Sequence, residues 1–221
     1  MVDEEFQVFD ARLKCPFSLI VAGPSGCGKS TFIANLLIHQ GRLIDKDLDY
    51  ILWFYGEVPP DPSLVQSLGN VRAIQGLPDS FDNYIQSSQN GLALFEDLMS
   101  ECSKNEQITA FFTRKSHHQN ISVIFVTQNF YHQGRERKNF GRNAKYLCIF
   151  DSPLDKTIPY SLAQKLMPRN QSAFIDMFNH AIDYTHYGYL FIDGDQTSPK
   201  NAKFRTDIFG DTQRVLIPLK K

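Results

Sequence analysis

The residues best suited to chemistry form a glycine-rich segment near the start of the chain, GPSGCGKST. It fits the pattern G-x-x-x-x-G-K-[ST] at Gly23, Gly28, Lys29 and Ser30. In such a loop the glycines let backbone N–H groups turn toward phosphate oxygens, the lysine reaches the β and γ phosphates, and the serine hydroxyl ligates Mg²⁺. The residues expected to hold a nucleotide's phosphates are Gly23, Pro24, Ser25, Gly26, Cys27, Gly28, Lys29, Ser30 and Thr31.

A phosphate loop also needs a carboxylate at the end of a neighbouring strand, and the segment LALFED offers two, Glu96 and Asp97. In the usual order the first acid serves the metal and the second polarises the attacking water. We therefore expect Glu96 to serve Mg²⁺ with Ser30, and Asp97 to act as the general base. In one alternative Asp97 serves the metal and there is no dedicated base; in another Asp193, in FIDGD, is a rival second carboxylate, although that segment is more typical of a turn.

The segment ISVIFVTQN carries an apolar run directly into Thr127, Gln128 and Asn129. Ligands of parallel sheets bind beyond the carboxyl ends of the strands. A glutamine there can orient the attacking water or sense the γ-phosphate, so Gln128 is a further candidate catalytic residue. The alternative is a simple turn that ends the strand.

Short, nearly continuous apolar runs that are rich in β-branched and aromatic residues indicate strands buried on both faces. Such runs occur at 17–22, 50–55, 92–95, 121–127, 146–150 and 187–192. Helices are expected at 29–39, 98–115, 156–166 and 172–184, and loops at 56–76 and 194–199, where Pro, Gly and Asp cluster. The alternation predicts an α/β, three-layer P-loop NTPase with a mostly parallel central sheet.

Composition limits the function classes. The chain has 221 residues, 42% hydrophobic and 21% charged, which predicts one globular domain over 1–221. Its net charge of −1 means that nucleic-acid binding would need a local basic cluster. No apolar run is long enough to span a membrane, and the acidic start is unlike a secretory signal. The four cysteines lack CxxC spacing, so we expect no zinc site or disulfide framework and an intracellular location.

The string DLMSECSKNEQITAFFTRKSHHQNISVIFVTQNFYHQG, read together with the phosphate loop, resembles the packaging ATPases of Polinton (Maverick) elements, adintoviruses and their relatives. These belong with the poxvirus-type packaging ATPases in the FtsK–HerA superfamily. The resemblance is specific over about 22–146 and looser through GYLFID and FRTDIF. Lys29, Ser30 and Gln128 match the family's loop and sensor positions. Glu96 and Asp97 match its acidic pair, although the family more often has Asp first, so an additional methylene must be accommodated.

The resemblance implies a ring-forming, ATP- and Mg²⁺-dependent pump that moves double-stranded DNA into a capsid. It implies capsid or portal proteins as partners, no membrane, and a location in the host nucleus or cytoplasm or with the virion. Ring ATPases of this type complete each site with an arginine from the next subunit, whose guanidinium offsets charge on the transferred phosphoryl group. Arg114 is the first candidate and Arg142 the second; the alternative for either is a solvated surface charge.

A basic cluster follows the sensor strand in the segment GRERKNFGRNAK. It comprises Arg135, Arg137, Lys138, Arg142 and Lys145. In a ring ATPase such a loop can contact the DNA backbone; the alternatives are a solvated loop and the arginine-rich lid of a small nucleotide or nucleoside kinase. The leading prediction is a DNA-packaging ATPase. The second is that kinase, and the third is an assembly protein that binds ATP with little turnover.

Overall fold

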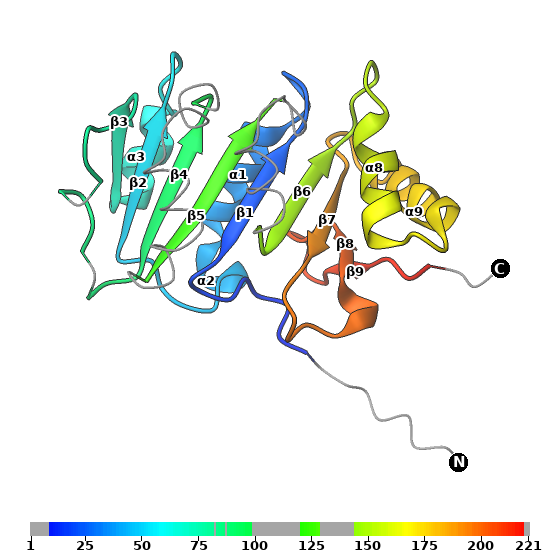
Figure 1. The fold of residues 1–221 in the computed structure, drawn as a ribbon. Coiled ribbons are helices and arrows are strands. Elements are labelled where there is room, and N and C mark those ends of the chain that lie inside the picture. Colours follow the sequence, from blue (N-terminus) through cyan, green and yellow to red (C-terminus); the bar gives the residue numbers. More distant parts are fainter. Residues whose placement is uncertain (1–8, 82, 87, 99–119, 129–143, 219–221) are drawn as a thin grey trace.

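A nine-stranded sheet forms the centre of the described structure. The computed structural model describes residues 9–81, 83–86, 88–98, 120–128 and 144–218. The strands are β1 Ser18–Ala22, β2 Tyr50–Tyr55, β3 Val71–Gln75, β4 Gly91–Glu96, β5 Ile121–Thr127, β6 Tyr146–Phe150, β7 Tyr189–Asp193, β8 Phe204–Thr206 and β9 Arg214–Val215. Across the sheet they are ordered β3-β2-β4-β5-β1-β6-β7-β8-β9 (Figure 1).

The pairing of the strands divides the sheet into two parts. All neighbours from β3 to β6 are parallel. The strands β7, β8 and β9 extend the sheet in antiparallel pairs. The mostly parallel α/β sheet predicted from the apolar runs is therefore confirmed.

Helices cover both faces of the sheet. They are α1 Lys29–Ile38, α2 Gln40–Leu43, α3 Pro62–Leu68, α8 Thr157–Leu166 and α9 Gln171–Asp183, with a short 3₁₀ helix, η2, at Lys200–Ala202. One apolar cluster joins α1 and α2 to one face of the sheet, with α3 at its margin. A second cluster joins α8 and α9 to the other face. The result is the three-layer arrangement expected of an α/β domain.

Side chains of each central strand alternate between these two clusters. In β4, Leu92 and Leu94 belong to the α1 cluster, whereas Ala93 and Phe95 belong to the opposite one. Every strand side chain is thus apolar because both faces are covered. The same alternation directs Glu96, the last residue of β4, toward the side of the sheet that carries α1.

The loop predicted at 56–76 was wrong, because this segment contains α3 and β3. Its Pro, Gly and Asp residues cap a helix rather than mark a loop. Asp61 is the N-cap and accepts a hydrogen bond from the Ser63 N–H at 2.8 Å, Pro62 begins the helix, and Gly69 ends it at φ 73°. The loop predicted at 194–199 is confirmed.

The last predicted apolar run, at 187–192, also differs from expectation. It forms β7 at Tyr189–Asp193, and this strand is antiparallel to β6, with Phe150 opposite Tyr189 and Tyr146 opposite Asp193. The start of β7 therefore lies at the edge of the sheet where the parallel strands end. The helix predicted at 98–115 falls, apart from Leu98, outside the described residues. None of the helices in the described part of the chain is long and apolar enough to cross a membrane.

Candidate nucleotide-binding site

The glycine-rich segment forms a tight loop between β1 and α1. Gly26 and Gly28 have φ values of 77° and 104°, in the region that L side chains avoid. Gly28 is the N-cap of α1, and no side chain caps this helix end or adds an acid to its first turn. The first N–H groups of α1 are therefore left for an anion, which the positive end of the helix dipole also favours.

The Lys29 side chain folds back over this loop. It is 8% exposed, and its ammonium donates hydrogen bonds to the carbonyl oxygens of Gly23, at 2.9 Å, and Pro24, at 2.7 Å. An ammonium has three donors, so these two contacts anchor the group and leave one donor for a phosphate oxygen.

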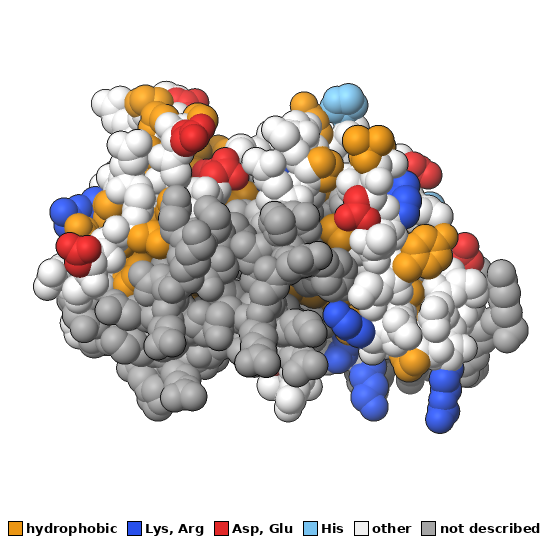
Figure 2. Space-filling model, turned by 45° about the horizontal axis from the view of Figure 1, so that its top comes forward, with side chains coloured by type: hydrophobic (Ala, Val, Ile, Leu, Met, Phe, Trp, Pro, Cys, Tyr) orange, Lys and Arg blue, Asp and Glu red, His pale blue; other side chains and the backbone are white. Residues whose placement is uncertain are grey.

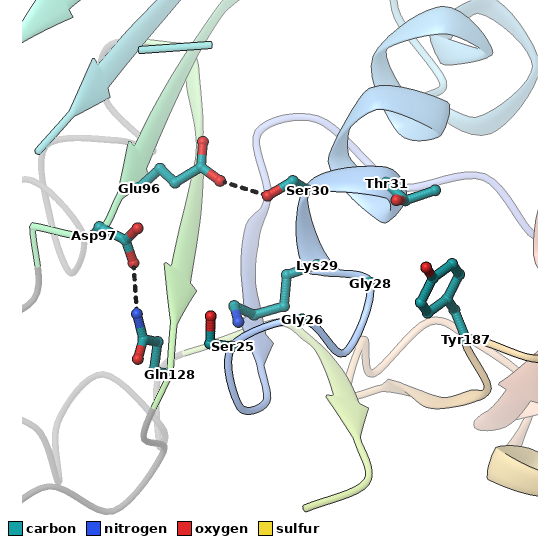
Figure 3. A pocket seen from close by; sticks show the side chains of 10 residues that line it. All are labelled: Ser25, Gly26, Gly28, Lys29, Ser30, Thr31, Glu96, Asp97, Gln128 and Tyr187. Atoms are coloured by element: carbon teal, nitrogen blue, oxygen red, sulfur yellow. Dashed lines mark hydrogen bonds between the residues drawn. The ribbon is translucent and has the colours of Figure 1, made fainter. Parts of the chain in front are cut away.

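Glu96 reaches from the end of β4 to the first turn of α1. The Ser30 hydroxyl donates to Glu96 Oε1 at 3.1 Å, and the Trp53 indole N–H donates to Glu96 Oε2 at 3.0 Å (Figure 3). Burial raises the pKa of the Glu96 carboxyl, and the hydrogen bonds from Trp53 and Ser30 offset part of this rise. The additional methylene of glutamate is thus accommodated by a side chain that is held at both oxygens.

Asp97 occupies the turn that follows β4. Its backbone has φ 56°, a left-handed conformation that aspartate adopts more readily than most residues. The amide of Gln128, which follows β5, lies 3.5 Å from Asp97 Oδ1, at the limit of a hydrogen bond. Figure 3 shows Glu96, Asp97 and Gln128 together on one side of Lys29.

These groups line one cavity of about 270 Å³. Its lining comprises Ser25, Gly26, Gly28, Lys29, Ser30, Thr31, Glu96, Asp97, Gln128 and Tyr187. Of the other predicted loop residues, Gly23 and Pro24 supply the carbonyls that hold Lys29. Pro24 and Cys27 also border an adjacent cavity of about 410 Å³. The predicted trans-acting candidates Arg114 and Arg142 lie outside the described residues, as does Asn129.

The sequence analysis missed Tyr187. This side chain lies beyond Gly28, on the opposite side of the loop from the acids (Figure 3). Its ring packs so closely on Gly28 that a Cβ there would lie 2.8 Å from the Tyr187 Cβ. A tyrosine that precedes a strand carries no signature of its own. Only the antiparallel direction of β7 brings it to this edge of the sheet.

Asp193, the rival second carboxylate, lies at the other end of β7 and thus at the opposite edge of the sheet from the loop. Its Oδ2 is 2.8 Å from Arg205 Nη2, and the two side chains are 3% and 1% exposed. Lys145, the described member of the basic cluster, precedes β6 at that same edge, where its ammonium is 2.6 Å from Asp195 Oδ2. The geometry excludes Asp193 from the phosphate site, and the charge of Lys145 is already paired.

The donor atoms at the loop fit Mg²⁺. Ser30 and Glu96 offer hydroxyl and carboxylate oxygens, the hard ligands that Mg²⁺ prefers, and they already lie within hydrogen-bond distance of each other. Among the residues that the structure describes, no group of three or more His, Cys, Asp or Glu could hold a metal ion. This suits Mg²⁺, which usually takes one or two protein ligands and completes its shell with phosphate and water.

No protein-family model matches the chain, and no curated protein matches it in sequence. Among solved structures, the chain is similar to the genome packaging NTPase B204 from Sulfolobus turreted icosahedral virus 2, determined in complex with ATP-gammaS. The two are 13% identical with a TM-score of 0.54, over 93% of this chain and 98% of that one. The cytoplasmic domain of EssC aligns at 13% identity and a TM-score of 0.48, over 93% of this chain and 40% of that one. At these identities the similarity to B204 shows a shared fold.

Proposed function

We propose that this chain is an ATPase that drives the movement of double-stranded DNA, and that it packages a viral or virus-like genome into a capsid. The observation that carries the enzymatic part is the contact between Ser30 and Glu96 at an uncapped helix N-terminus. It combines an anion site with the hydroxyl and carboxylate oxygens that Mg²⁺–nucleotide sites use. Asp97 and Gln128 stand next to this contact, where an attacking water would be oriented.

The side chains suggest distinct roles in hydrolysis. Lys29 and the N–H groups of the loop bind the phosphates, and bound Mg²⁺, held by Ser30 and Glu96, would offset their negative charge. Water's oxygen forms a bond to the γ phosphorus while the bond from that phosphorus to the β–γ bridging oxygen breaks. ADP leaves, and Asp97, oriented with Gln128, accepts the proton of the water.

The site also suggests which way the nucleotide lies. The γ-phosphate must face the acids, since the attacking water is on their side. The nucleoside then extends past Gly28 toward Tyr187, which borders both the phosphate cavity and the adjacent one. A tyrosine ring offers a flat face on which a base can stack.

The DNA-motor part of the proposal has two supports. The fold matches that of a genome packaging NTPase over nearly the full length of both chains. The motifs around Lys29, Glu96 and Gln128 resemble those of packaging ATPases of Polinton elements and their relatives. We propose accordingly a homo-oligomeric ring with capsid or portal proteins as partners, DNA contacts from the basic segment 135–145, and Arg114, or Arg142, completing the neighbouring subunit's site.

Exposed apolar side chains beside the site support the oligomeric part of the proposal. Leu154, between β6 and α8, is fully exposed, and Tyr160 and Leu166 on α8 are largely exposed. Figure 2 shows hydrophobic side chains on the surface of this α8 side of the molecule. A neighbouring subunit that covered them would remove apolar area from water.

Phosphate release from ATP, measured with and without duplex DNA and with nucleoside monophosphates as a control, tests the proposal. We expect hydrolysis that duplex DNA stimulates and that monophosphates leave unchanged. ADP formation only in the presence of a nucleotide acceptor would identify a kinase instead. Binding without turnover under all conditions would favour a nucleotide-gated assembly protein.

A further inference from the structure

Trp53, in the middle of β2, makes a contact that the phosphate-loop chemistry does not itself explain. It is the only tryptophan of the chain, its side chain is 3% exposed, and its indole N–H donates to Glu96 Oε2 at 3.0 Å. A buried indole N–H needs an acceptor, and a neutral carbonyl would satisfy it. Here the acceptor is a carboxylate of the candidate metal site, so the contact is charge-assisted and stronger than such a bond to a neutral group.

The strand register explains how the two side chains meet. Tyr55 pairs with Glu96 and Trp53 with Leu94, so Trp53 lies two residues back along the neighbouring strand from Glu96. Trp53 belongs to the apolar cluster on the α1 face, the same face toward which Glu96 is directed. Such diagonal pairs on one face of a sheet are within reach of long and aromatic side chains.

The end of β2 also holds the Glu96 backbone. The Gly56 N–H donates to the Glu96 carbonyl at 3.1 Å, and a Cβ on Gly56 would lie 3.0 Å from the Asp97 carbonyl oxygen. The main chain of Glu96 is therefore fixed by β2, while its carboxylate is fixed by Trp53 on one oxygen and by Ser30 on the other. Without the indole donor, a glutamate side chain with three rotatable bonds would be held at its tip by Ser30 alone among these contacts.

We propose that Trp53 is a positioning residue for the magnesium-dependent function of this site: its N–H holds the Glu96 carboxylate toward Ser30. The inference rests on the proposed ATPase function, because it concerns the same carboxylate. Hydrogen-bond partners of metal-site side chains typically change metal affinity or activity by roughly 10- to 100-fold when they are removed. An effect of that size is expected for the magnesium-dependent part of nucleotide binding.

The test compares wild-type protein, Trp53→Phe and Tyr146→Phe. Trp53→Phe removes the N–H and keeps an aromatic ring in the core. Tyr146→Phe is a matched control, because it removes a buried polar group that accepts a hydrogen bond from the Lys14 N–H at the opposite edge of the sheet. The affinity for ATPγS is measured by calorimetry with Mg²⁺ and again with EDTA.

We expect Trp53→Phe to bind ATPγS as the wild type does in EDTA, and to lose roughly 10-fold or more of the affinity that Mg²⁺ adds. Tyr146→Phe should retain that gain. An unchanged magnesium gain in Trp53→Phe, or an equal loss with and without Mg²⁺, overturns the positioning role while leaving the ATPase proposal intact. Wild-type protein that binds no ATPγS under either condition would instead overturn the proposed function, and the inference with it.

Tryptophan fluorescence provides a second measurement that does not depend on the folding of a core variant. All tryptophan emission of the chain comes from Trp53, so it reports on the surroundings of Glu96. We expect the wild-type emission to change when Mg²⁺ is added to the ATPγS complex, and this magnesium response to be absent in Glu96→Gln. A response of equal size in Glu96→Gln would show that the indole does not sense the carboxylate, and would overturn the inference.

Discussion

Ser30 and Glu96 are 66 positions apart in the chain, yet the Ser30 hydroxyl donates to Glu96 Oε1 at 3.1 Å. Glu96 ends β4 and Ser30 follows β1, and the sheet places β5 between these two strands. Two strand spacings amount to roughly 10 Å. The longer reach of glutamate, compared with aspartate, suits this separation, and the contact joins the candidate metal carboxylate to the phosphate loop.

Lys29→Ala should reduce ATP turnover by roughly 10²-fold or more, because the variant loses a buried ammonium aimed at the phosphates. Phosphate release under saturating ATP measures the effect. The exposed Lys46, changed to Ala, is the matched control and should retain wild-type turnover. Near wild-type turnover in Lys29→Ala, free of contaminating ATPase, would end the enzymatic interpretation.

Glu96→Gln and Asp97→Asn should fail in different ways. Glu96→Gln should raise the Mg²⁺ concentration needed for half-maximal turnover, because its carboxylate is the one that contacts Ser30. Asp97→Asn should bind Mg²⁺ and ATP but hydrolyse slowly, by roughly 10²-fold or more, because an amide cannot accept the proton of the water. Asparagine also tolerates the left-handed backbone at φ 56°. Titrating Mg²⁺ against rate distinguishes the two; if Asp97→Asn shifts the Mg²⁺ requirement instead, the two roles are reversed.

Tyr187→Ala should raise the KM for ATP by about 5-fold or more and leave kcat nearly unchanged, because a stacked base is lost while the phosphate contacts remain. Tyr187→Phe keeps the ring and should resemble the wild type. Tyr160→Ala, an exposed tyrosine on α8, is the matched control. Steady-state kinetics over a range of ATP concentrations test the expectation, and an unaltered KM in Tyr187→Ala would place the base elsewhere.

Asp193→Ala should destabilise the fold by about 3–5 kcal/mol, because it leaves the Arg205 guanidinium buried without its charged partner. Urea unfolding measures this loss. Removing both charges, with Asp193→Leu and Arg205→Met, should recover much of it, since an apolar pair of similar volume avoids the buried charge. The folded fraction of either variant should hydrolyse ATP at the wild-type rate. A selective loss of turnover in fully folded Asp193→Ala would return this residue to the list of catalytic candidates.

Replacing Arg135, Arg137 and Lys138 by Ala should flatten the salt dependence of duplex binding by about 0.9 in log–log slope per lost phosphate contact. Basal ATP turnover should persist, while its stimulation by DNA is lost. Fluorescence anisotropy of a labelled duplex at several salt concentrations measures the slope. The exposed Lys200, changed to Ala, is the control. A triple variant with unchanged slope and affinity would remove this segment from the DNA contact.

Much of the fold could be predicted from the sequence because its signals are local. The apolar runs at 50–55, 121–127 and 146–150 coincide with β2, β5 and β6, since strands covered on both faces must be apolar throughout. The phosphate loop is a contiguous motif whose glycines, lysine and serine each have a backbone or chemical reason to be there. The acids after β4 and Gln128 after β5 were likewise predictable, because parallel neighbouring strands end at one edge.

The rest depended on which strands pair and in which direction, and residues far apart in the chain decide that. Asp193 and Tyr187 lie at the two ends of one apolar run, and only the antiparallel pairing of β7 with β6 brings Tyr187 to the loop and takes Asp193 to the opposite edge. Trp53 is one aromatic residue among several in its strand until the register with β4 sets it diagonally behind Glu96. The sequence by itself determined the layers, the loop and the acidic pair, whereas the tertiary structure decided which side chains stand around them.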